Sequence, residues 1–267
     1  MIHELEPSDF SNVTHLFQGH KQYVPVFSVI DRNFPGRVFV DEKDSPDTAL
    51  VWAVSRWAYI DGDPTNPWFN SSFAELIQDV IIPSSVQMGM NWFELYTPDS
   101  LEWMTAIETG LSSYKPEKHH ETVFTFDELE YLNSRKSHSP PTGLRVERMQ
   151  TPILPEGARD APFVAEEFKT RTSFGFRLIR DQKVISICRS NGLASGNEFM
   201  IDVETFDEKE RSKGYATAVG RALLDYCLEH GYIPLWETTS DNIPSRKVAR
   251  RLGFVEHESY PVYAIEF

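Results

Sequence analysis

The sequence of 267 residues has little cysteine, no long apolar segment and too few basic residues to balance its acidic ones. Its two cysteines, Cys188 and Cys227, exclude a disulfide-stabilised scaffold and are typical of a reducing compartment. No apolar run approaches the ~20 residues that a membrane-spanning helix needs. The acidic start, residues 1–6, lacks the apolar segment of a signal peptide. We therefore expect a soluble, cytoplasmic protein with no membrane partner.

The negative charge is concentrated in the first half of the chain. The net charge is −14, and residues 1–143 hold 9 Lys and Arg against 21 Asp and Glu, a net of −12. Residues 144–267 hold 17 against 19, a net of −2. Because nucleic-acid-binding proteins usually carry a basic face, we expect no nucleic-acid partner. A polyanion would prefer the second half. An acidic first half would favour a cationic amine, although negative charge also simply favours solubility.

Length and composition allow two mixed α/β domains. A hydrophobic content of 40% and an aromatic content of 13% are sufficient for packed cores. The best boundary is the polar segment 133–143, which ends in Pro-Pro-Thr-Gly. We predict an N-terminal domain at 1–142 and a C-terminal domain at 143–267, and we find no internal repeat in the sequence.

Hydrophobic periodicity predicts alternating helices and strands in the first half. Trp68 falls in a predicted loop, and we expect it to be the aromatic residue most available to a substrate cleft. The predicted strands are 37–41, 49–60, 91–96 and 122–126, and the predicted helices are 9–17, 71–82 and 100–111.

The second half begins with a predicted strand at 144–149, a helix at 160–169 and a hairpin of strands 173–179 and 183–189. Apolar and mostly polar residues then alternate over 198–205, which predicts a strand with one apolar face. Apolar residues at helical spacing predict a helix over 215–230, ended by Gly231. Residues 211–217 therefore connect a strand to a helix N-terminus, where free N–H groups and the helix dipole favour an anion.

The chain ends with three further predicted elements. Residues 232–239 form a strand, and a short helix follows, capped near Asp241 or Asn242, with Pro244 in its first turn and Gly253 at its end. A last strand covers 260–267.

This order of elements, with Arg-x-x-Gly-x-Ala at 211–216, Asn-x-x-Ser at 242–245 and Leu-Gly-Phe at 252–254, resembles the GNAT superfamily of acetyl-CoA-dependent N-acetyltransferases. The resemblance covers roughly residues 172–267 and implies a GNAT fold with acetyl-CoA as co-substrate. The long N-terminal half resembles the two-domain branch that includes the zwittermicin A resistance acetyltransferase. That half would suit a degenerate acyltransferase-like layer without its own cofactor, because it has no Arg-x-x-Gly-x-Ala segment.

The resemblance assigns the cofactor to two segments. The backbone near Val203, Glu204 and Thr205 would hold the pantetheine arm, because in the family this strand splays from the next one. Asn242 matches a residue near the pantetheine, and a plain helix cap is the alternative. The predicted pyrophosphate loop consists of Arg211, Ser212, Lys213, Gly214, Tyr215, Ala216 and Thr217.

For catalysis the resemblance points to an acidic base on the same strand. Asp202 and Glu204 share its polar face and are the candidates, since a carboxylate beside apolar groups has a raised pKa. The alternative is that they are solvated surface residues. Family members often carry a tyrosine seven residues after the asparagine, but here that position is Ala249. We assign no general acid, and no metal, because the adjacent His119 and His120 lack further ligands at suitable spacing.

We therefore expect an N-acetyltransferase that moves an acetyl group from acetyl-CoA to a primary amine, on a small molecule, by direct attack. The alternative is a non-catalytic acyl-CoA-binding or sensing protein on the same fold, which the missing tyrosine would favour. A third candidate is an acyltransferase acting on a protein or peptide N-terminus. The sequence leaves the identity of the amine and the oligomeric state open.

Overall fold

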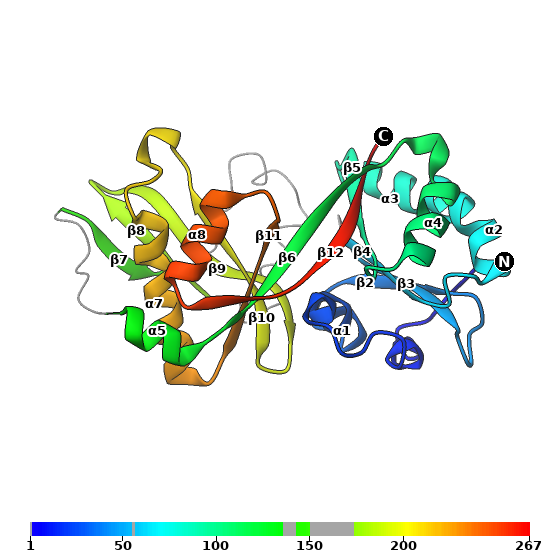
Figure 1. Ribbon diagram of the computed structural model, residues 1–267, viewed down its shortest axis with the longest axis horizontal. Coiled ribbons are helices and arrows are strands. Elements are labelled where there is room, and N and C mark those ends of the chain that lie inside the picture. Colours follow the sequence, from blue (N-terminus) through cyan, green and yellow to red (C-terminus); the bar gives the residue numbers. More distant parts are fainter. Residues whose placement is uncertain (1, 55–56, 136–142, 150–173) are drawn as a thin grey trace. The chain divides into compact units, whose positions relative to one another are not determined.

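A computed structural model describes residues 2–54, 57–135, 143–149 and 174–267, drawn in colour in Figure 1. The described chain forms two compact units. Unit 1 contains the residues up to Glu121 and the C-terminal segment Glu258–Phe267, and unit 2 contains the described residues from Thr122 to His257. The predicted linker 133–143 lies mostly, and the predicted helix 160–169 entirely, outside the described residues, so the domain boundary at 142/143 stays a prediction.

The strands of unit 1 follow the order β1-β2-β3-β4-β5-β12. Neighbours pair antiparallel from β1 to β4 and between β5 and β12, whereas β4 and β5 pair in parallel. The strands are β1 (His3–Glu4), β2 (Gly36–Val40), β3 (Thr48–Ala53), β4 (Trp57–Gly62), β5 (Trp92–Tyr96) and β12 (Phe254–Glu266), of which unit 1 holds the part from Glu258 onward.

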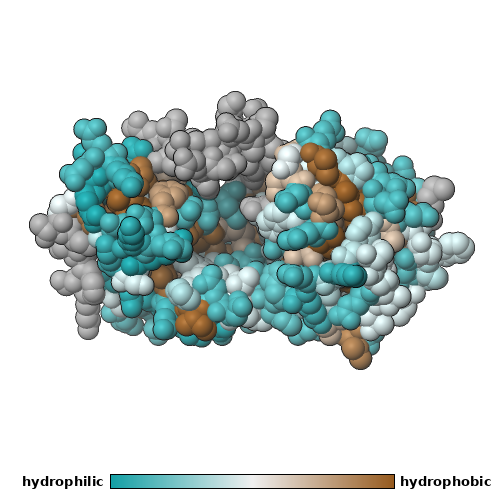
Figure 2. Space-filling view, turned by 90° about the horizontal axis from the view of Figure 1, so that it is seen from above, coloured by the Kyte–Doolittle hydropathy of each residue, from teal (hydrophilic) through white to brown (hydrophobic). Residues whose placement is uncertain are grey.

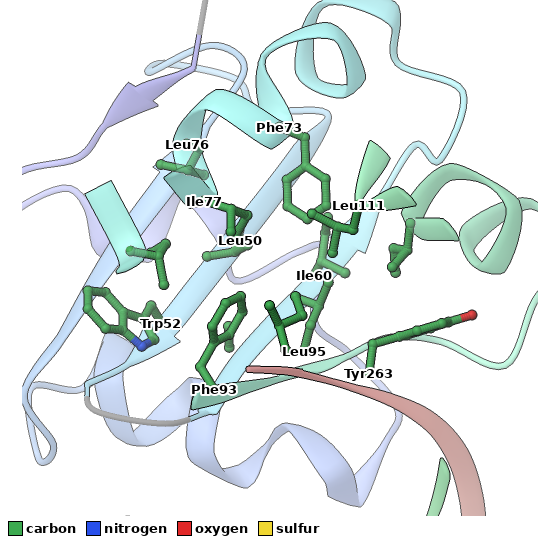
Figure 3. Packing of buried hydrophobic residues seen from close by; sticks show 14 of the residues in the cluster. Leu50, Trp52, Ile60, Phe73, Leu76, Ile77, Phe93, Leu95, Leu111 and Tyr263 are labelled. Carbon is green, nitrogen blue, oxygen red and sulfur yellow. The ribbon is translucent and has the colours of Figure 1, made fainter. Parts of the chain in front are cut away.

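One face of this sheet packs against the helices that flank β5 in the chain. Leu50, Trp52 and Ile60 from β3 and β4 meet Phe73 of α2, and Tyr263 of β12 joins the same cluster (Figure 3). The last strand of the chain therefore completes the core of the first half. The helices of unit 1 are α1 (Val24–Ile30), α2 (Pro67–Leu76), α3 (Ile82–Gln87) and α4 (Leu101–Gly110), the short helical turns are η1 (Phe10–Val13), η2 (Lys21–Tyr23) and η4 (Ser112–Tyr114), and the π-helical turn is η3 (Ile77–Ile81).

The strands of unit 2 follow the order β6-β11-β10-β9-β8-β7. Pairing is antiparallel from β7 to β10, and β10 and β11 are parallel. Helix α7 packs on β8, β9 and β10, and its buried residues Val219, Leu223 and Cys227 form a core with strand residues. The strands are β6 (Glu117–Phe126), of which unit 2 holds the part from Thr122 onward, β7 (Arg145–Arg148), β8 (Gly175–Arg180), β9 (Lys183–Ser195), β10 (Glu198–Thr205) and β11 (Ile233–Thr239), and the helices are α5 (Glu128–Ser134), η6 (Glu208–Glu210), α7 (Tyr215–His230) and α8 (Ile243–Arg251).

The two units repeat one order of elements that the sequence does not reveal. In each, four strands form an antiparallel sheet, a helical segment follows the fourth strand, and a fifth strand returns parallel to the fourth. The helical segment is α2–α3 in unit 1 and α7 in unit 2. The next strand in the chain then joins the other unit's order: β6 lies next to β11, and β12 lies next to β5. Each half of the sequence thus supplies one strand to the other half's unit.

Three predictions in the first half are wrong. The predicted helix 9–17 is the four-residue 3-10 turn η1. The predicted strand 49–60 is two antiparallel strands, β3 and β4. Both are largely buried, so their apolar residues form one run, and the residues between them include no Gly, Pro or Asn that would mark a turn. Trp68 lies in the first turn of α2 and not in a loop, with 72% of its surface exposed.

The predictions for the second half are largely confirmed. The strand 198–205 and the helix 215–230 have the predicted bounds, and Gly231 ends the helix in the left-handed conformation. Asn242 is the N-cap of α8. The last strand is longer than predicted, because β12 already begins at Phe254.

Within the described residues, no helix combines the length and apolar character needed to cross a membrane. On the face drawn in Figure 2, hydrophilic residues cover most of the described surface and hydrophobic residues form separate patches.

Gly253 offers a test of how α8 is joined to β12. Its φ of +84° is unfavourable for other residues, and an added Cβ would lie 2.7 Å from the backbone nitrogen of Tyr131 in α5. Gly253→Ala should therefore lower the free energy of unfolding by about 2–4 kcal/mol. The control is Gly231→Ala, with a φ of +70° and no atom within 4 Å of the added Cβ, which should cost only about 1–2 kcal/mol. Urea denaturation measures both, and equal losses would contradict the role of the α5 contact.

Candidate functional site

The site is organised by an opening in the sheet of unit 2. The parallel pairing of β10 with β11 covers only three residue pairs and ends at Met200 with Leu235. Both strands continue, β10 to Thr205 and β11 to Thr239. The carboxyl-terminal parts of two parallel strands are thus left unpaired with each other at the edge of the sheet where α7 begins.

The backbone of β10 offers polar groups to this opening. The N–H of Phe206 donates to the carbonyl oxygen of Ile185, and the Ser186 hydroxyl donates to the carbonyl oxygen of Glu204. Even-numbered residues here therefore direct their backbone groups toward β9. Since these directions alternate along a strand, Val203 and Thr205 direct theirs toward the open side. They are two of the three backbone positions, Val203, Glu204 and Thr205, that the family resemblance assigned to the pantetheine arm.

Along β10, odd-numbered and even-numbered side chains lie on opposite faces of the sheet. Ile201 and Val203 pack against the apolar clusters beneath α7 and α8. Asp202 and Glu204 occupy the opposite face, as predicted. Glu237 on β11 lies on that same face. Met200 and Leu235 are in register and share a face, Glu237 is two residues after Leu235, and Trp236 between them packs into the cluster under α8. No local sequence pattern indicates Glu237, because the face it shares with residues of β10 follows only from the register of the two strands.

The two predicted carboxylates have different surroundings. Asp202 accepts hydrogen bonds from Nε and Nη2 of Arg189, at 3.0 and 2.8 Å, and the Arg189 side chain is only 9% exposed. Burial raises the pKa of Glu204, and the negative charge of Asp202 raises it further, while Arg189 and Arg211 oppose the shift. Asp202 is therefore the counter-ion of a buried cation, whereas Glu204 is a carboxylate whose pKa is raised, as expected of a base.

The loop from β10 to α7 exposes a helix N-terminus. Gly214 is its N-cap, with a φ of +82°, and Ser212 is also in the left-handed region with a φ of +61°. Because glycine has no side chain, Gly214 itself offers no capping group to the first N–H groups of α7. Among the described residues, no atom lies within 4 Å of a Cβ built on Gly214, so these residues leave space beside the backbone there. The Thr217 hydroxyl is buried and has no hydrogen-bond partner among the described residues. Because a buried hydroxyl does not reach a ligand at this turn, the backbone N–H groups are the donors there.

Charged side chains surround this loop. Arg211 lies beside Glu208 at 3.5 Å, and Lys213 donates to Glu210 at 3.0 Å. Arg180, at the end of β8, donates to Glu210 at 3.0 Å and to the Tyr215 hydroxyl at 2.7 Å. No local sequence pattern indicates Arg180, because it is 31 residues from Arg211 and only the pairing of β8, β9 and β10 brings it to this loop.

At the start of α8, Asn242 is the helix cap. Its side-chain oxygen accepts from the N–H of Ser245, which is the alternative that the sequence analysis left open. The Ser245 hydroxyl accepts from the indole N–H of Trp236 at 3.0 Å. Ala249, at the position of the family's tyrosine, is fully buried in the cluster that includes Trp236. No general acid can be assigned from this arrangement.

The equivalent helix of unit 1 has a different N-terminus. The side-chain oxygen of Asn66 caps α2 by accepting from the N–H groups of Trp68 and Phe69. The groups that are open at Gly214 are therefore occupied by a side chain at Asn66. A surface pocket of about 490 Å³ lies beside α2 and α4 and touches none of the predicted site residues.

The two cysteines belong to the apolar core of unit 2. Cys188 and Cys227 are buried, and burial raises the pKa of the Cys227 thiol to about 12, so neither is a thiolate nucleophile at neutral pH. In the part of the chain that the structure describes, no group of three or more His, Cys, Asp or Glu residues could hold a metal ion. His119 lies in β6, with its Nε2 3.4 Å from Glu121 and 3.8 Å from Glu94.

Known proteins resemble the chain over nearly its full length. A family model described as GNAT acetyltransferase matches residues 14–263. The uncharacterized N-acetyltransferase YdfB of Bacillus subtilis (strain 168) is 24% identical over 275 residues, with 98% of each chain covered. The GCN5-related N-acetyltransferase-like protein from Streptococcus suis 89/1591 superposes with a TM-score of 0.69 at 19% identity, covering 97% of this chain and 99% of its own. A tandem GNAT protein from the clavulanic acid biosynthesis pathway gives a TM-score of 0.59 at 12% identity, covering 100% and 98%.

The pair of Arg189 and Asp202 can be tested through stability. Asp202→Ala would remove the carboxylate that accepts two hydrogen bonds from the buried Arg189 guanidinium, so the free energy of unfolding should fall by about 1–3 kcal/mol. The double variant Arg189→Met and Asp202→Ala removes both charges and should recover part of that loss. Urea denaturation of the two variants and the parent measures the difference. An unchanged stability in Asp202→Ala would show that the pair does not hold β9 and β10 together.

Proposed function

Because the chain belongs to the GNAT acetyltransferase family, we propose that it transfers the acetyl group of acetyl-CoA to a primary amine of a small molecule by direct attack. Membership of the family implies acyltransferase activity. The use of acetyl-CoA, the amine and its small size are the finer parts of the proposal. The site residues are proposed here from the geometry of unit 2.

One observation carries the proposal: an uncapped helix N-terminus follows a strand whose pairing with its neighbour has ended. Gly214 provides the first feature, and the end of pairing at Met200 and Leu235 provides the second. An elongated ligand with an anionic end needs both, namely N–H donors for its phosphate and free backbone groups for its arm. The tight, uncapped turn at Gly214 fits a pyrophosphate, because the groups that would contact it are backbone N–H groups with open space before them.

We assign the pyrophosphate of coenzyme A to the first N–H groups of α7, from Tyr215, Ala216 and Thr217. Arg211 and Lys213 add positive charge beside them, and Ser212 and Gly214 supply the left-handed turn. The backbone groups of Val203 and Thr205 would hold the pantetheine arm. Asn242 retains its side-chain nitrogen as a donor after capping α8 with its oxygen, and this nitrogen would serve the same arm.

We assign the role of base to Glu204. The co-substrate supplies an activated acetyl group as a thioester, and the amine must be neutral to attack it. Glu204 would take the proton that the amine nitrogen loses, directly or through one water, as the carbon–nitrogen bond forms. The carbon–sulfur bond breaks, and coenzyme A leaves as its thiolate. Asp202 would stay paired with Arg189 and keep a negative charge close to Glu204.

The acceptor is proposed to be a small cationic amine. The net charge of −12 in residues 1–143 would attract such a ligand, and Asp202, Glu204 and Glu237 line one face beside the opening. We also propose that the first half is a degenerate acyltransferase-like unit without its own cofactor. Its repeated order of elements supports this, as does Asn66, which caps α2 where unit 2 has Gly214. Placement in the zwittermicin A resistance branch and a cytoplasmic location remain proposals.

A second candidate is a non-catalytic acyl-CoA-binding or sensing protein. It is favoured by one observation, that Ala249 is buried in an apolar cluster where the family often has a tyrosine. The two candidates differ in turnover. Titration of the protein with acetyl-CoA, followed by a free-thiol release assay against a panel of amines, separates them, since a sensor would bind without releasing coenzyme A.

Gly214→Asp should abolish binding of acetyl-CoA. It places a negative side chain where phosphates would sit and strains a backbone with a φ of +82°, so affinity should fall at least about 100-fold. The control is Gly196→Asp, at an exposed turn between β9 and β10 with a φ of +57° and no atom within 4 Å of the added Cβ. Calorimetric titration measures both. Equal affinity of the Gly214 variant and the parent protein would remove the loop assignment.

Glu204→Gln should lower the turnover number by about 100-fold or more and change the affinity for acetyl-CoA little. In the parent protein the rate should fall as pH decreases through the raised pKa of Glu204, since only the carboxylate accepts a proton. Asp202→Asn removes a neighbouring negative charge, so this acidic limb should move to lower pH. A rate–pH profile of the three proteins tests the assignment. Parent-like rates in Glu204→Gln at all pH values would exclude Glu204 as the base.

A further inference from the structure

Three charged side chains from separate segments meet beside the N-terminus of α7. Glu210, in the turn η6, accepts from Arg180 through Oε1 at 3.0 Å and from Lys213 through Oε2 at 3.0 Å. Arg180 also donates to the Tyr215 hydroxyl at 2.7 Å, with its guanidinium carbon 5.6 Å from the centre of the Tyr215 ring. Both cations are therefore held in fixed positions.

The two cations are more accessible than the carboxylate between them. The exposed fractions of the Arg180 and Lys213 side chains are 35% and 47%, against 17% for Glu210. The hydrogen bonds from Lys213 and Arg180 lower the pKa of Glu210, so Glu210 is ionised at neutral pH. One negative charge thus holds two positive ones, and the cluster keeps a net charge of +1 beside the positive end of a helix dipole.

The helix N-terminus alone does not match the charge of coenzyme A. Three uncapped N–H groups can contact one phosphoryl group or the bridge of a pyrophosphate. Coenzyme A also carries a phosphate on the 3′-oxygen of its ribose. That group needs cations outside the helix turn, and a guanidinium with N–H groups left after binding Glu210 and Tyr215 is suited to a phosphate.

We propose that Arg180 and Lys213 form a second phosphate subsite that binds the 3′-phosphate of coenzyme A and selects it over 3′-dephospho-coenzyme A. The inference rests on the proposed use of coenzyme A at Gly214. Arg180 supplies the fixed, forked donor, and Lys213 supplies a second charge from the loop. Glu210 holds the two cations together before the ligand binds.

The test compares the affinities of coenzyme A and 3′-dephospho-coenzyme A by calorimetric titration. The parent protein should bind coenzyme A more tightly. Arg180→Gln should lower the affinity for coenzyme A by about tenfold or more and leave the affinity for 3′-dephospho-coenzyme A nearly unchanged, because only coenzyme A has the additional phosphate. Arg180→Lys keeps the charge and should keep most of the preference.

Arg177→Gln is the matched control, since Arg177 lies on the same strand, is 32% exposed and pairs with Glu147 instead. It should retain the parent preference. Equal weakening of both ligands in Arg180→Gln would overturn the proposal, because it would show that Arg180 only maintains the loop or contacts the pyrophosphate. Unchanged affinities for both ligands in Arg180→Gln would also overturn the proposal. If the parent protein binds neither ligand, the proposed function itself fails, and the inference fails with it.

Discussion

The structure depends on the short parallel pairing between β10 and β11. Buried backbone N–H and carbonyl groups are almost always paired, so a strand whose neighbour separates after three residue pairs must find other partners for its polar groups. On one side, β9 provides them as far as Thr205. On the other side, Val203 and Thr205 face the opening. In the proposed function, the extended arm of the ligand lies along this opening, which ends where α7 begins.

The charged residues around the opening form two groups, an acidic one on β10 and a mainly basic one at the N-terminus of α7. On the polar face of β10, the buried Arg189 fixes Asp202 as an ion-pair partner, and the same Asp202 helps to keep the pKa of Glu204 raised. Asp202 and Glu204, two residues apart on one strand, therefore differ in chemistry because Asp202 accepts hydrogen bonds from the buried Arg189, whereas burial raises the pKa of Glu204. At the helix N-terminus, by contrast, positive charge dominates. Arg180 joins the basic residues of the loop there through Glu210 and Tyr215.

The two units show how one arrangement of strands can carry a site in one case and a closed helix end in the other. Both have four antiparallel strands, a helical segment and a parallel fifth strand. In unit 2 the helix begins at a glycine, and its N–H groups stay open. In unit 1 the helix begins at Asn66, whose side chain occupies two of them. The proposed anion site of unit 2 and the ordinary helix cap of unit 1 thus differ by one side chain.

The sequence by itself determined the local features of the second half. The alternation at 198–205, the helix over 215–230 and the caps at Asn242 and Gly231 depend on residues close together in the chain, so periodicity and cap chemistry were sufficient to predict them. The same holds for the position of the loop at 211–217. In the first half the local signals were weaker, and the buried hairpin β3–β4 looked like a single strand because both of its strands are apolar.

The tertiary structure alone decided which distant residues meet. No local pattern indicates that Arg189 pairs with Asp202, that Arg180 reaches Glu210, or that Glu237 shares a face with Glu204, since these contacts follow from strand register. The same is true of the exchange of β6 and β12 between the two units and of the order of elements that they repeat. Register and strand exchange are set by the packing of whole sheets and by burial of their shared cores, which no short segment of sequence encodes.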